Sequence, residues 1–203
     1  PVFALPSEYG IGCFSKEAYE FVDQLKKAGQ SKWQILPLGP TGYGDSPYQS
    51  VSTFAGNPYF IDLETLIDKK LLTKEECESC DWGGSESYVD YEKMYLSRYK
   101  LLRKAYERAD LKNDPDYMVF LKKEKDWLLD YCLFMAIKNA QNGKCWIDWP
   151  EELKDRHSKA VKEAEKELAE EVGFYSFQQY CFTTQWNKLK EYANEKGIQI
   201  IGD

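Results

Sequence analysis

The sequence contains a single histidine, His157, and this scarcity limits the metal chemistry open to the chain. Zinc sites are built mainly from closely spaced cysteine and histidine side chains. Of the six cysteines only Cys77 and Cys80 lie near one another, and neither a second pair nor a histidine accompanies them. We therefore predict no metal and no cofactor. We interpret the C-x-x-C pair as two positions of a short helix, and we expect His157 to be exposed.

A positive charge balance and a long apolar run are also missing. The chain has 27 Lys and Arg against 34 Asp and Glu, a net charge of -7. Nucleic-acid-binding surfaces normally carry a basic stripe, and a membrane span needs ~20 apolar residues. The sequence therefore predicts neither a nucleic-acid partner nor a membrane association. With no signal peptide and scattered cysteines, a reducing cytoplasmic location is expected.

Helix and strand signals define the predicted fold class. The chain has 203 residues, enough for one domain or for part of a larger one. Ser15 is a good N-cap and Gly29 a good stop, which predicts a helix over 15–29. Apolar runs predict buried strands over 32–38 and 198–201. Two buried strands separated by helices indicate an α/β protein with a parallel sheet.

The region from 72 to 197 is predicted to be mostly helical. Thr73 and Glu76 form the T-x-x-E pattern of a capping box, which marks a helix start. Periodicity and stop signals then predict five further helices, near 91–109, 115–123, 126–142, 158–172 and 174–196.

The segment GPTGYGDSPYQS, residues 39–50, follows the first predicted strand and concentrates the chemistry of the chain. A P-loop would need Lys after Gly44, where the sequence has Asp45, and G-x-G-x-x-G spacing is absent. Sugar sites need aromatic faces, carboxylates and amides, and the segment supplies Tyr43, Asp45, Ser46 and Tyr48. The same residue types are common in structural turns. Composition alone leaves a sugar platform and an ornate turn both open.

Three stretches of the sequence resemble one known family. They are LPSEYGIG (5–12), the long segment KWQILPLGPTGYGDSPYQSVSTFAGNPYFIDLETL (32–66) and FYSFQQYCFTTQWNKLKEYANEKGIQIIGD (174–203). They are similar to the N-terminal part of the 4-α-glucanotransferases, the amylomaltases or disproportionating enzymes of glycoside hydrolase family 77. The resemblance spans nearly the whole chain, and the helical middle carries least of it.

The resemblance implies a fold and a reaction. The fold would be the first two strands of a (β/α)8 TIM barrel, with a helical insertion at about 67–172. The reaction would be transfer of α-1,4-glucan segments between maltooligosaccharide or starch-type chains, by double displacement with retention. The loop after the first strand would then lie at the C-terminal face of the barrel, where active sites of this fold occur.

The resemblance also assigns site residues. Tyr48 matches a tyrosine that packs on the sugar beside the cleaved bond, and Ser46 a neighbour within hydrogen-bond reach of that sugar. Tyr43 resembles a position in a second glucan site near the cleft. Asp203 matches an aspartate at the end of the second strand, facing the donor sugar or bracing the catalytic groups. Asp45 is expected either to line the cleft or to hold the loop through an Asx turn.

The resemblance assigns no catalytic residue to these 203 residues. The nucleophile and the acid/base group of the family lie later in the chain, so we expect a piece of a longer protein with the remainder of the barrel after Asp203. Two alternatives stay open beside the transferase. One is a catalytically incomplete glucan-binding or scaffold fragment, and the other is a retaining α-glucan hydrolase.

Overall fold

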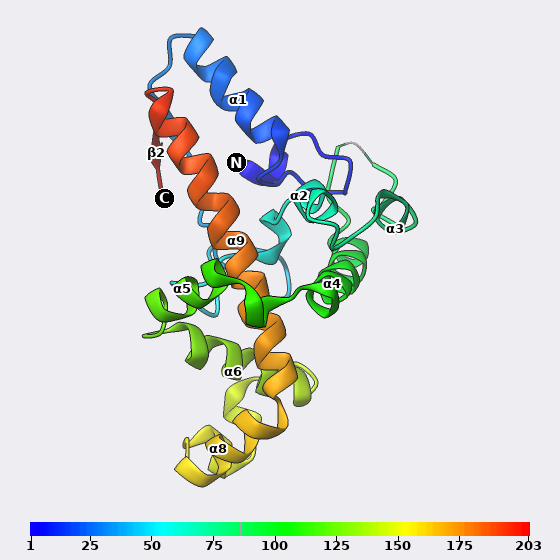
Figure 1. Ribbon diagram of the computed structural model, residues 1–203, viewed down its shortest axis with the longest axis vertical. Helices are drawn as coiled ribbons and strands as arrows, with labels where there is room; N and C mark the ends of the chain where they lie inside the picture. The colour runs from blue at the N-terminus through cyan, green and yellow to red at the C-terminus, as the bar shows by residue number, and fades with distance from the viewer. Residues whose placement is uncertain (86) are drawn as a thin grey trace. The chain divides into compact units, whose positions relative to one another are not determined.

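The computed structural model describes residues 1–85 and 87–203, and the chain divides into two compact units (Figure 1). The first unit comprises Pro1–Asp110 and Cys181–Asp203, and the second comprises Leu111–Tyr180. The described chain is mostly helical, with a small parallel sheet. The helical insertion predicted at about 67–172 stays a prediction, because a division into compact units does not test it.

The sheet has two strands, β1 (Lys32–Gln34) and β2 (Gln199–Ile201), which pair in parallel. The predicted parallel pairing is confirmed, but the predicted buried strand over 32–38 is too long. Pairing stops after Ile35, whose N–H donates to the Ile201 carbonyl at 2.9 Å. Pro37, two residues further on, has no N–H to donate to a ladder.

The strands are also less buried than predicted. In β1 only Trp33 is buried, while in β2 burial falls from Ile198, just before the strand, to an exposed Ile201. The two strands therefore bury few apolar side chains.

The first unit contains α1 (Lys16–Lys27), α2 (Leu63–Asp68), α3 (Lys74–Glu78), α4 (Tyr91–Arg108) and the C-terminal part of α9 (Ala169–Glu195). Two short 3-10 turns, η1 (Val2–Ala4) and η2 (Pro58–Phe60), complete it. The predicted limits of α1 are confirmed: Ser15 is its N-cap and Gly29, with φ +71°, follows its end. The Ser15 hydroxyl donates to Glu17 at 2.5 Å and caps no backbone N–H.

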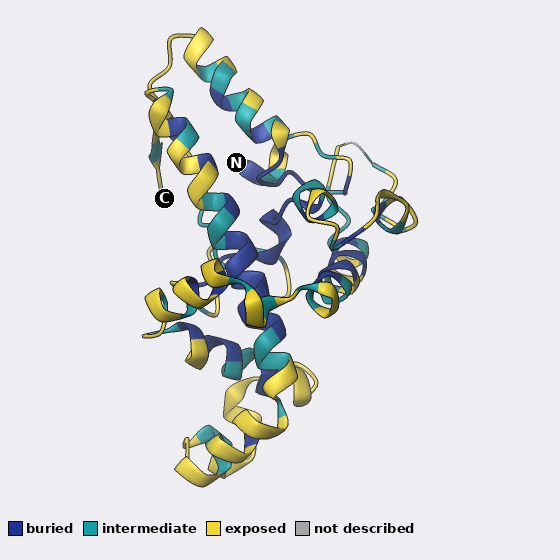
Figure 2. Ribbon diagram, in the orientation of Figure 1, coloured by how far each residue is buried: buried dark blue, intermediate teal, exposed yellow. Residues whose placement is uncertain are grey.

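An aromatic cluster around Phe14 forms part of the core of this unit. The middle of α9, which contributes to it, is coloured as buried in Figure 2. The Phe14 ring lies 5.7 Å from Phe60, 5.2 Å from Phe182 and 5.4 Å from Trp186, between ring centroids. These rings come from the segment before α1, from η2 and from α9. Aromatic pairs at such distances stabilise a core beyond their buried area, so the cluster ties the two ends of the unit's sequence together.

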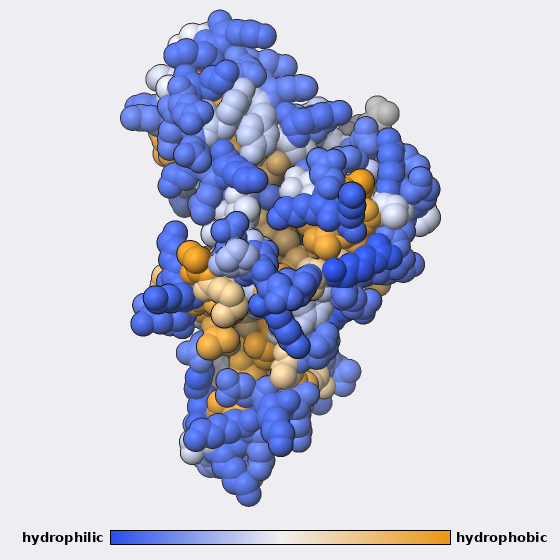
Figure 3. Space-filling model, in the orientation of Figure 1, coloured by the Kyte–Doolittle hydropathy of each residue, from blue (hydrophilic) through white to orange (hydrophobic). Residues whose placement is uncertain are grey.

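The second unit contains α5 (Pro115–Lys123), α6 (Leu128–Ala140), α7 (Glu151–Lys154), α8 (Ser158–Glu167) and the first part of α9, with short turns η3 (Leu111–Asn113) and η4 (Trp146–Asp148). The helix α5 matches its predicted limits, and His157 is exposed as expected. In Figure 3 apolar side chains gather over α5 and α6, where Met118, Val119 and Leu129 are exposed.

The predicted boundary between the helices 158–172 and 174–196 is wrong, because α8 ends at Glu167 and α9 begins at Ala169 and continues through Gly173. A glycine inside a helix costs about 1 kcal/mol relative to alanine. Burial of the flanking Phe174 and Phe177 offsets that cost. The helix also carries tertiary hydrogen bonds in this unit: Ser176 with Tyr117 at 2.9 Å and Tyr180 with Asp114 at 3.0 Å.

Two features are absent from residues 1–85 and 87–203. No group of three or more His, Cys, Asp or Glu side chains could hold a metal ion. In the same part of the chain, no helix combines the length and apolar character needed to cross a membrane. The six cysteines, all described, carry free thiols, and burial raises the pKa of Cys77 to about 12.

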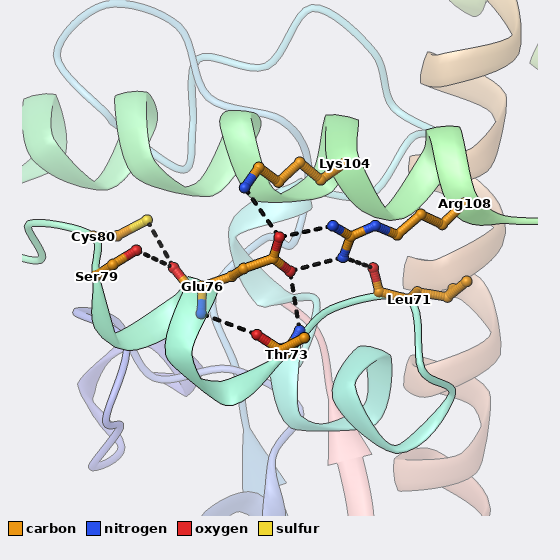
Figure 4. A network of polar contacts seen from close by, with 7 residues as sticks. All are labelled: Leu71, Thr73, Glu76, Ser79, Cys80, Lys104 and Arg108. Atoms are coloured by element: carbon orange, nitrogen blue, oxygen red, sulfur yellow. Dashed lines mark hydrogen bonds and ion pairs between the residues drawn. The ribbon is translucent and has the colours of Figure 1, made fainter.

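A polar network around Glu76 joins α3 to α4 (Figure 4). The Glu76 carboxylate accepts two hydrogen bonds from the Arg108 guanidinium, both at 2.7 Å, and one from Lys104 at 3.0 Å. It also accepts the Thr73 N–H, while the Thr73 hydroxyl accepts the Glu76 N–H. The predicted capping box is therefore confirmed, and it doubles as an anchor for α4.

Glu76→Gln is expected to lower the melting temperature at pH 7 and to lose this effect in acid. Arg108, and then Lys104, hold the pKa of Glu76 well below its ordinary value of 4.5. A depressed folded-state pKa stabilises above the unfolded-state pKa, and that stability disappears as pH falls toward the folded-state value. Melting by circular dichroism at pH 7 and pH 3 checks this, with the exposed Glu78→Gln as control. If Glu76→Gln lowers the melting temperature as much at pH 3 as at pH 7, the cause is not electrostatic.

Candidate functional site

A pocket of about 350 Å³ lies in the first unit beside the 39–50 loop. Three segments far apart in the sequence form its walls. One is the N-terminal segment, another is the stretch that follows β1, and the third combines η2 with the start of α4. The residues that line the pocket include Val2, Phe3, Ile11, Asp45, Ser46, Tyr48, Tyr59, Phe60 and Tyr91.

Backbone contacts fix the base of the loop. Thr41 and Ser50 form an antiparallel bridge, and the Leu38 carbonyl accepts the Asn57 N–H at 2.8 Å. Gly39 is needed for the close approach, because a Cβ there would lie 2.7 Å from the Ser50 hydroxyl. Residues 39–50 therefore return to their starting point and project the tip as an ordered structure.

Two tight turns orient the side chains at the tip. The Asp45 N–H donates to the Gly42 carbonyl and the Gln49 N–H to the Ser46 carbonyl, each at 3.1 Å. Gly44 and Asp45 both have positive φ, +94° and +52°, and only Gly adopts such angles without cost. Aspartate tolerates the left-handed region better than most other residue types, which limits the strain at Asp45.

Tyr48 and Asp203, both singled out from the sequence, are brought together. The Tyr48 hydroxyl donates a hydrogen bond to the Asp203 carboxylate across 155 positions of sequence. The loop follows β1 and Asp203 follows β2, so the two residues meet at the edge where both parallel strands end. This hydrogen bond is the main cause that raises the pKa of the Tyr48 hydroxyl. It fixes the direction of a ring that is otherwise 66% exposed.

Asp45 and Ser46 line the pocket and also stabilise the loop. The Asp45 carboxylate accepts a hydrogen bond from the Thr41 hydroxyl at 3.2 Å. Burial raises the pKa of Asp45, and the bond from Thr41 opposes this with a smaller effect. The Ser46 hydroxyl accepts the Tyr48 N–H at 3.4 Å. The two alternatives stated for Asp45, cleft lining and loop holding, are thus compatible.

Tyr43 is placed differently from the other predicted site residues. Its side chain is fully exposed at the tip of the loop, and it is absent from the described residues that line the pocket. Asn57, seven residues after the 39–50 loop, caps η2 by accepting the Tyr59 N–H at 3.0 Å.

Sequence reasoning missed the aromatic wall opposite the loop. Tyr59 of η2 and Tyr91 of α4 face the pocket with ring centroids 6.1 Å apart, and Phe60 lies beside them. Burial raises the pKa of both tyrosines, so their hydroxyls stay protonated. The NPYF motif was a usable signal for Tyr59, whereas nothing local distinguishes Tyr91 from other helix-start residues.

A buried arginine supports this wall from behind. The Arg98 side chain is fully buried and donates to the carbonyls of Ile61 and Tyr9, the latter at 3.4 Å. Its guanidinium also lies 5.8 Å from the centre of the Trp82 ring. Burial lowers the pKa of Arg98, and no carboxylate is among its hydrogen-bond partners in the described chain.

The pocket combines aromatic faces with neutral hydroxyls and the Asp45 carboxylate at its loop side. Such a surface suits a neutral polyhydroxylated ligand, whose C–H faces pack on rings and whose hydroxyls bond to fixed oxygens. A phosphate would meet Asp45 without a compensating cation among the described lining residues.

Comparisons with known proteins point to one family. The profile of glycoside hydrolase family 77, described as 4-alpha-glucanotransferase, matches residues 1–203. A 4-alpha-glucanotransferase of Clostridium butyricum is 48% identical over 202 residues, covering 100% of this chain and 42% of that protein. The Thermus thermophilus 4-alpha-glucanotransferase is 46% identical over 204 residues, covering 98% and 40%.

A solved structure shows the same fold. The amylomaltase from Streptococcus agalactiae, in complex with acarbose, superposes with a TM-score of 0.94 at 39% identity, covering 100% of this chain and 41% of that chain. The chain therefore spans about two fifths of the length of the relatives it matches.

Proposed function

Because the chain belongs to glycoside hydrolase family 77, the 4-alpha-glucanotransferases, we propose that it forms part of an enzyme that transfers α-1,4-glucan segments between maltooligosaccharide or starch-type chains. The observation that carries the proposal is the family match over all 203 residues. The fold similarity to an amylomaltase in complex with acarbose supports it, as does a pocket whose lining suits a neutral sugar.

The proposed architecture is a partial (β/α)8 barrel. We assign β1 and β2 to its first two strands and about 67–172 to a helical insertion. Their parallel pairing is the support for this assignment. The residues that follow β1 at its C-terminal end line the pocket, and the C-terminal ends of the strands form the edge used by active sites of this fold.

In the proposed site, the Tyr48 ring packs against a glucosyl ring and its hydrogen bond to Asp203 holds it in place. Ser46, Asp45 and Asp203 offer hydrogen-bonding oxygens to the sugar hydroxyls. The exposed Tyr43 serves a second glucan contact outside the pocket. A retaining double displacement needs a carboxylate nucleophile and an acid/base carboxyl about 5–5.5 Å apart. We assign neither role within this chain and propose that both follow Asp203.

Incubation of the full-length enzyme with maltotriose tests the proposal. Chromatography should reveal longer maltooligosaccharides together with glucose, because cleavage of maltotriose that releases glucose leaves a maltosyl-enzyme, and a second glucan then accepts the maltosyl group. Release of shorter sugars without any longer product would favour the α-glucan hydrolase. Binding of maltooligosaccharide without turnover would favour the glucan-binding or scaffold alternative, and neither binding nor products would refute the proposed function.

Tyr48→Phe in the full-length enzyme is expected to reduce kcat/KM for maltotriose about five- to tenfold, the size of one lost hydrogen bond. Phenylalanine retains the aromatic face but cannot donate to Asp203. The exposed Tyr88, which lies outside the pocket, supplies the matched control Tyr88→Phe. Steady-state kinetics of both variants test this prediction. Equal kcat/KM values would show that Tyr48 is not part of the site.

A further inference from the structure

The second unit contains a pocket of its own, of about 300 Å³, between α6, η4, α7 and α8. It shares no residue with the pocket in the first unit. Its floor is apolar and aromatic. Trp149 is buried there, with its ring centroid 5.2 Å from Phe134, and its indole N–H donates to the Lys144 carbonyl at 3.2 Å. Trp149 is thus a satisfied core residue that shapes the cavity.

Trp146 lines the same pocket in a different way. It lies in the same short turn as Ile147, and half of its surface is exposed to solvent, at 50%. An indole held at the mouth of a cavity offers a flat apolar face and an N–H donor to a ligand. The core of the unit is already formed by Trp149, Ile137 and Ala164, so the exposed ring is not needed to fill it.

An exposed ion pair borders the pocket. Arg156 and Asp130 are joined at 2.8 Å, with side chains 64% and 68% exposed. A pair this exposed contributes little to stability, but it presents guanidinium N–H donors and a carboxylate acceptor at the border of the pocket. Its charges cancel, and Lys154 adds a single positive charge at the edge. The border therefore suits hydroxyl groups better than a highly charged ligand.

We propose that this pocket is a second carbohydrate site, which binds a segment of an α-1,4-glucan chain against Trp146 with hydroxyls bonded to Asp130 and Arg156. The inference rests on the proposed function, because only a protein that handles a polymeric glucan gains from a second contact along it. A long glucan that contacts this pocket gains affinity that maltotriose bound in the first unit does not gain. The pocket in the second unit would thus favour long substrates over maltotriose.

Native gel electrophoresis of the full-length enzyme through amylopectin tests this proposal. Trp146→Ala should weaken retardation by the polysaccharide at least fivefold, and Asp130→Asn should weaken it less. Ile147→Ala is the matched control, since Ile147 is 57% exposed in the same turn but does not line the pocket. Turnover of maltotriose should stay unchanged in all three variants, because that short substrate needs only the other site.

The outcomes separate the two proposals. If the enzyme converts maltotriose but Trp146→Ala is retarded like the unmodified protein, the second site is wrong and the proposed function stands. Equal losses for Trp146→Ala and Ile147→Ala would also overturn the site. Loss of binding of an apolar dye in Trp146→Ala with unchanged retardation would show that the pocket takes an apolar ligand. If maltotriose is not converted at all, the proposed function itself fails.

Discussion

Replacing Arg98 with methionine is expected to lower the free energy of unfolding by about 3 kcal/mol. The side chain is fully buried, and its guanidinium donates to the Ile61 and Tyr9 carbonyls. Methionine retains an unbranched stem but has no donor, so both carbonyls lose a partner at about 1–3 kcal/mol each. Relief from burying a charge offsets part of this loss.

Urea unfolding followed by circular dichroism measures the effect. Lys100→Met is the matched control, because Lys100 is exposed on the same helix α4. It removes a positive charge without touching the interior, and a change within about 0.5 kcal/mol is expected for it. If Arg98→Met is as stable as this control, water or a shifted backbone satisfies the two carbonyls. The hydrogen bonds from Arg98 to Ile61 and Tyr9 would then not stabilise the fold.

The position of these carbonyls connects stability to the pocket. Ile61 directly follows Phe60, and Tyr9 lies two residues before Ile11; Phe60 and Ile11 both line the pocket. Arg98 therefore holds two of the pocket walls together from behind. We expect Arg98→Met in the full-length enzyme to raise KM for maltotriose in addition to lowering stability, since the sugar-facing wall loses its support.

Local signals in the sequence predicted the features that depend on local physics. Gly29 ends α1 with a left-handed φ because glycine has no Cβ to clash. Thr73 and Glu76 cap α3 as their spacing requires. The predicted strand over 32–38 is too long because its length depends on a partner 167 positions away, and that partner offers only three residues. The predicted boundary between the helices 158–172 and 174–196 is wrong because the packing of Phe174 and Phe177 outweighs the low helix propensity of Gly173.

In the candidate site too, some residues could be predicted from the sequence and others could not. Tyr48 and Asp203 were chosen by family resemblance, and two parallel strands suffice to expect their ends at one edge. Tyr91 and Arg98 carry no such signal, because the position of each at or behind the pocket wall is set by contacts between segments far apart in sequence. Arg98 contacts carbonyls 37 and 89 positions away, and no sequence window contains that information. The roles of the predicted residues in binding sugar stay predictions.

Gly12→Ala is expected to destabilise the first unit by about 3 kcal/mol, through a clash that no rotamer relieves. A Cβ at this position would lie 2.2 Å from the Val2 carbonyl oxygen and 2.7 Å from both the nitrogen and the oxygen of Leu5. All three are backbone atoms, so the N-terminal turn must move as a whole. That turn is held by the Gly12 N–H, which donates to the Phe3 carbonyl at 3.1 Å.

Gly84→Ala provides the control, since a Cβ there meets nothing within 4 Å and its φ is not left-handed. Thermal unfolding of both variants should separate them clearly, with Gly84→Ala close to the unmodified chain. Displacement of the turn also moves Val2 and Phe3 out of the pocket wall. The full-length Gly12→Ala enzyme should therefore bind maltotriose more weakly at temperatures where it is still folded. Unchanged stability with unchanged KM would mean that the N-terminal turn does not pack on Gly12. The N-terminal segment would then not form a wall of the pocket.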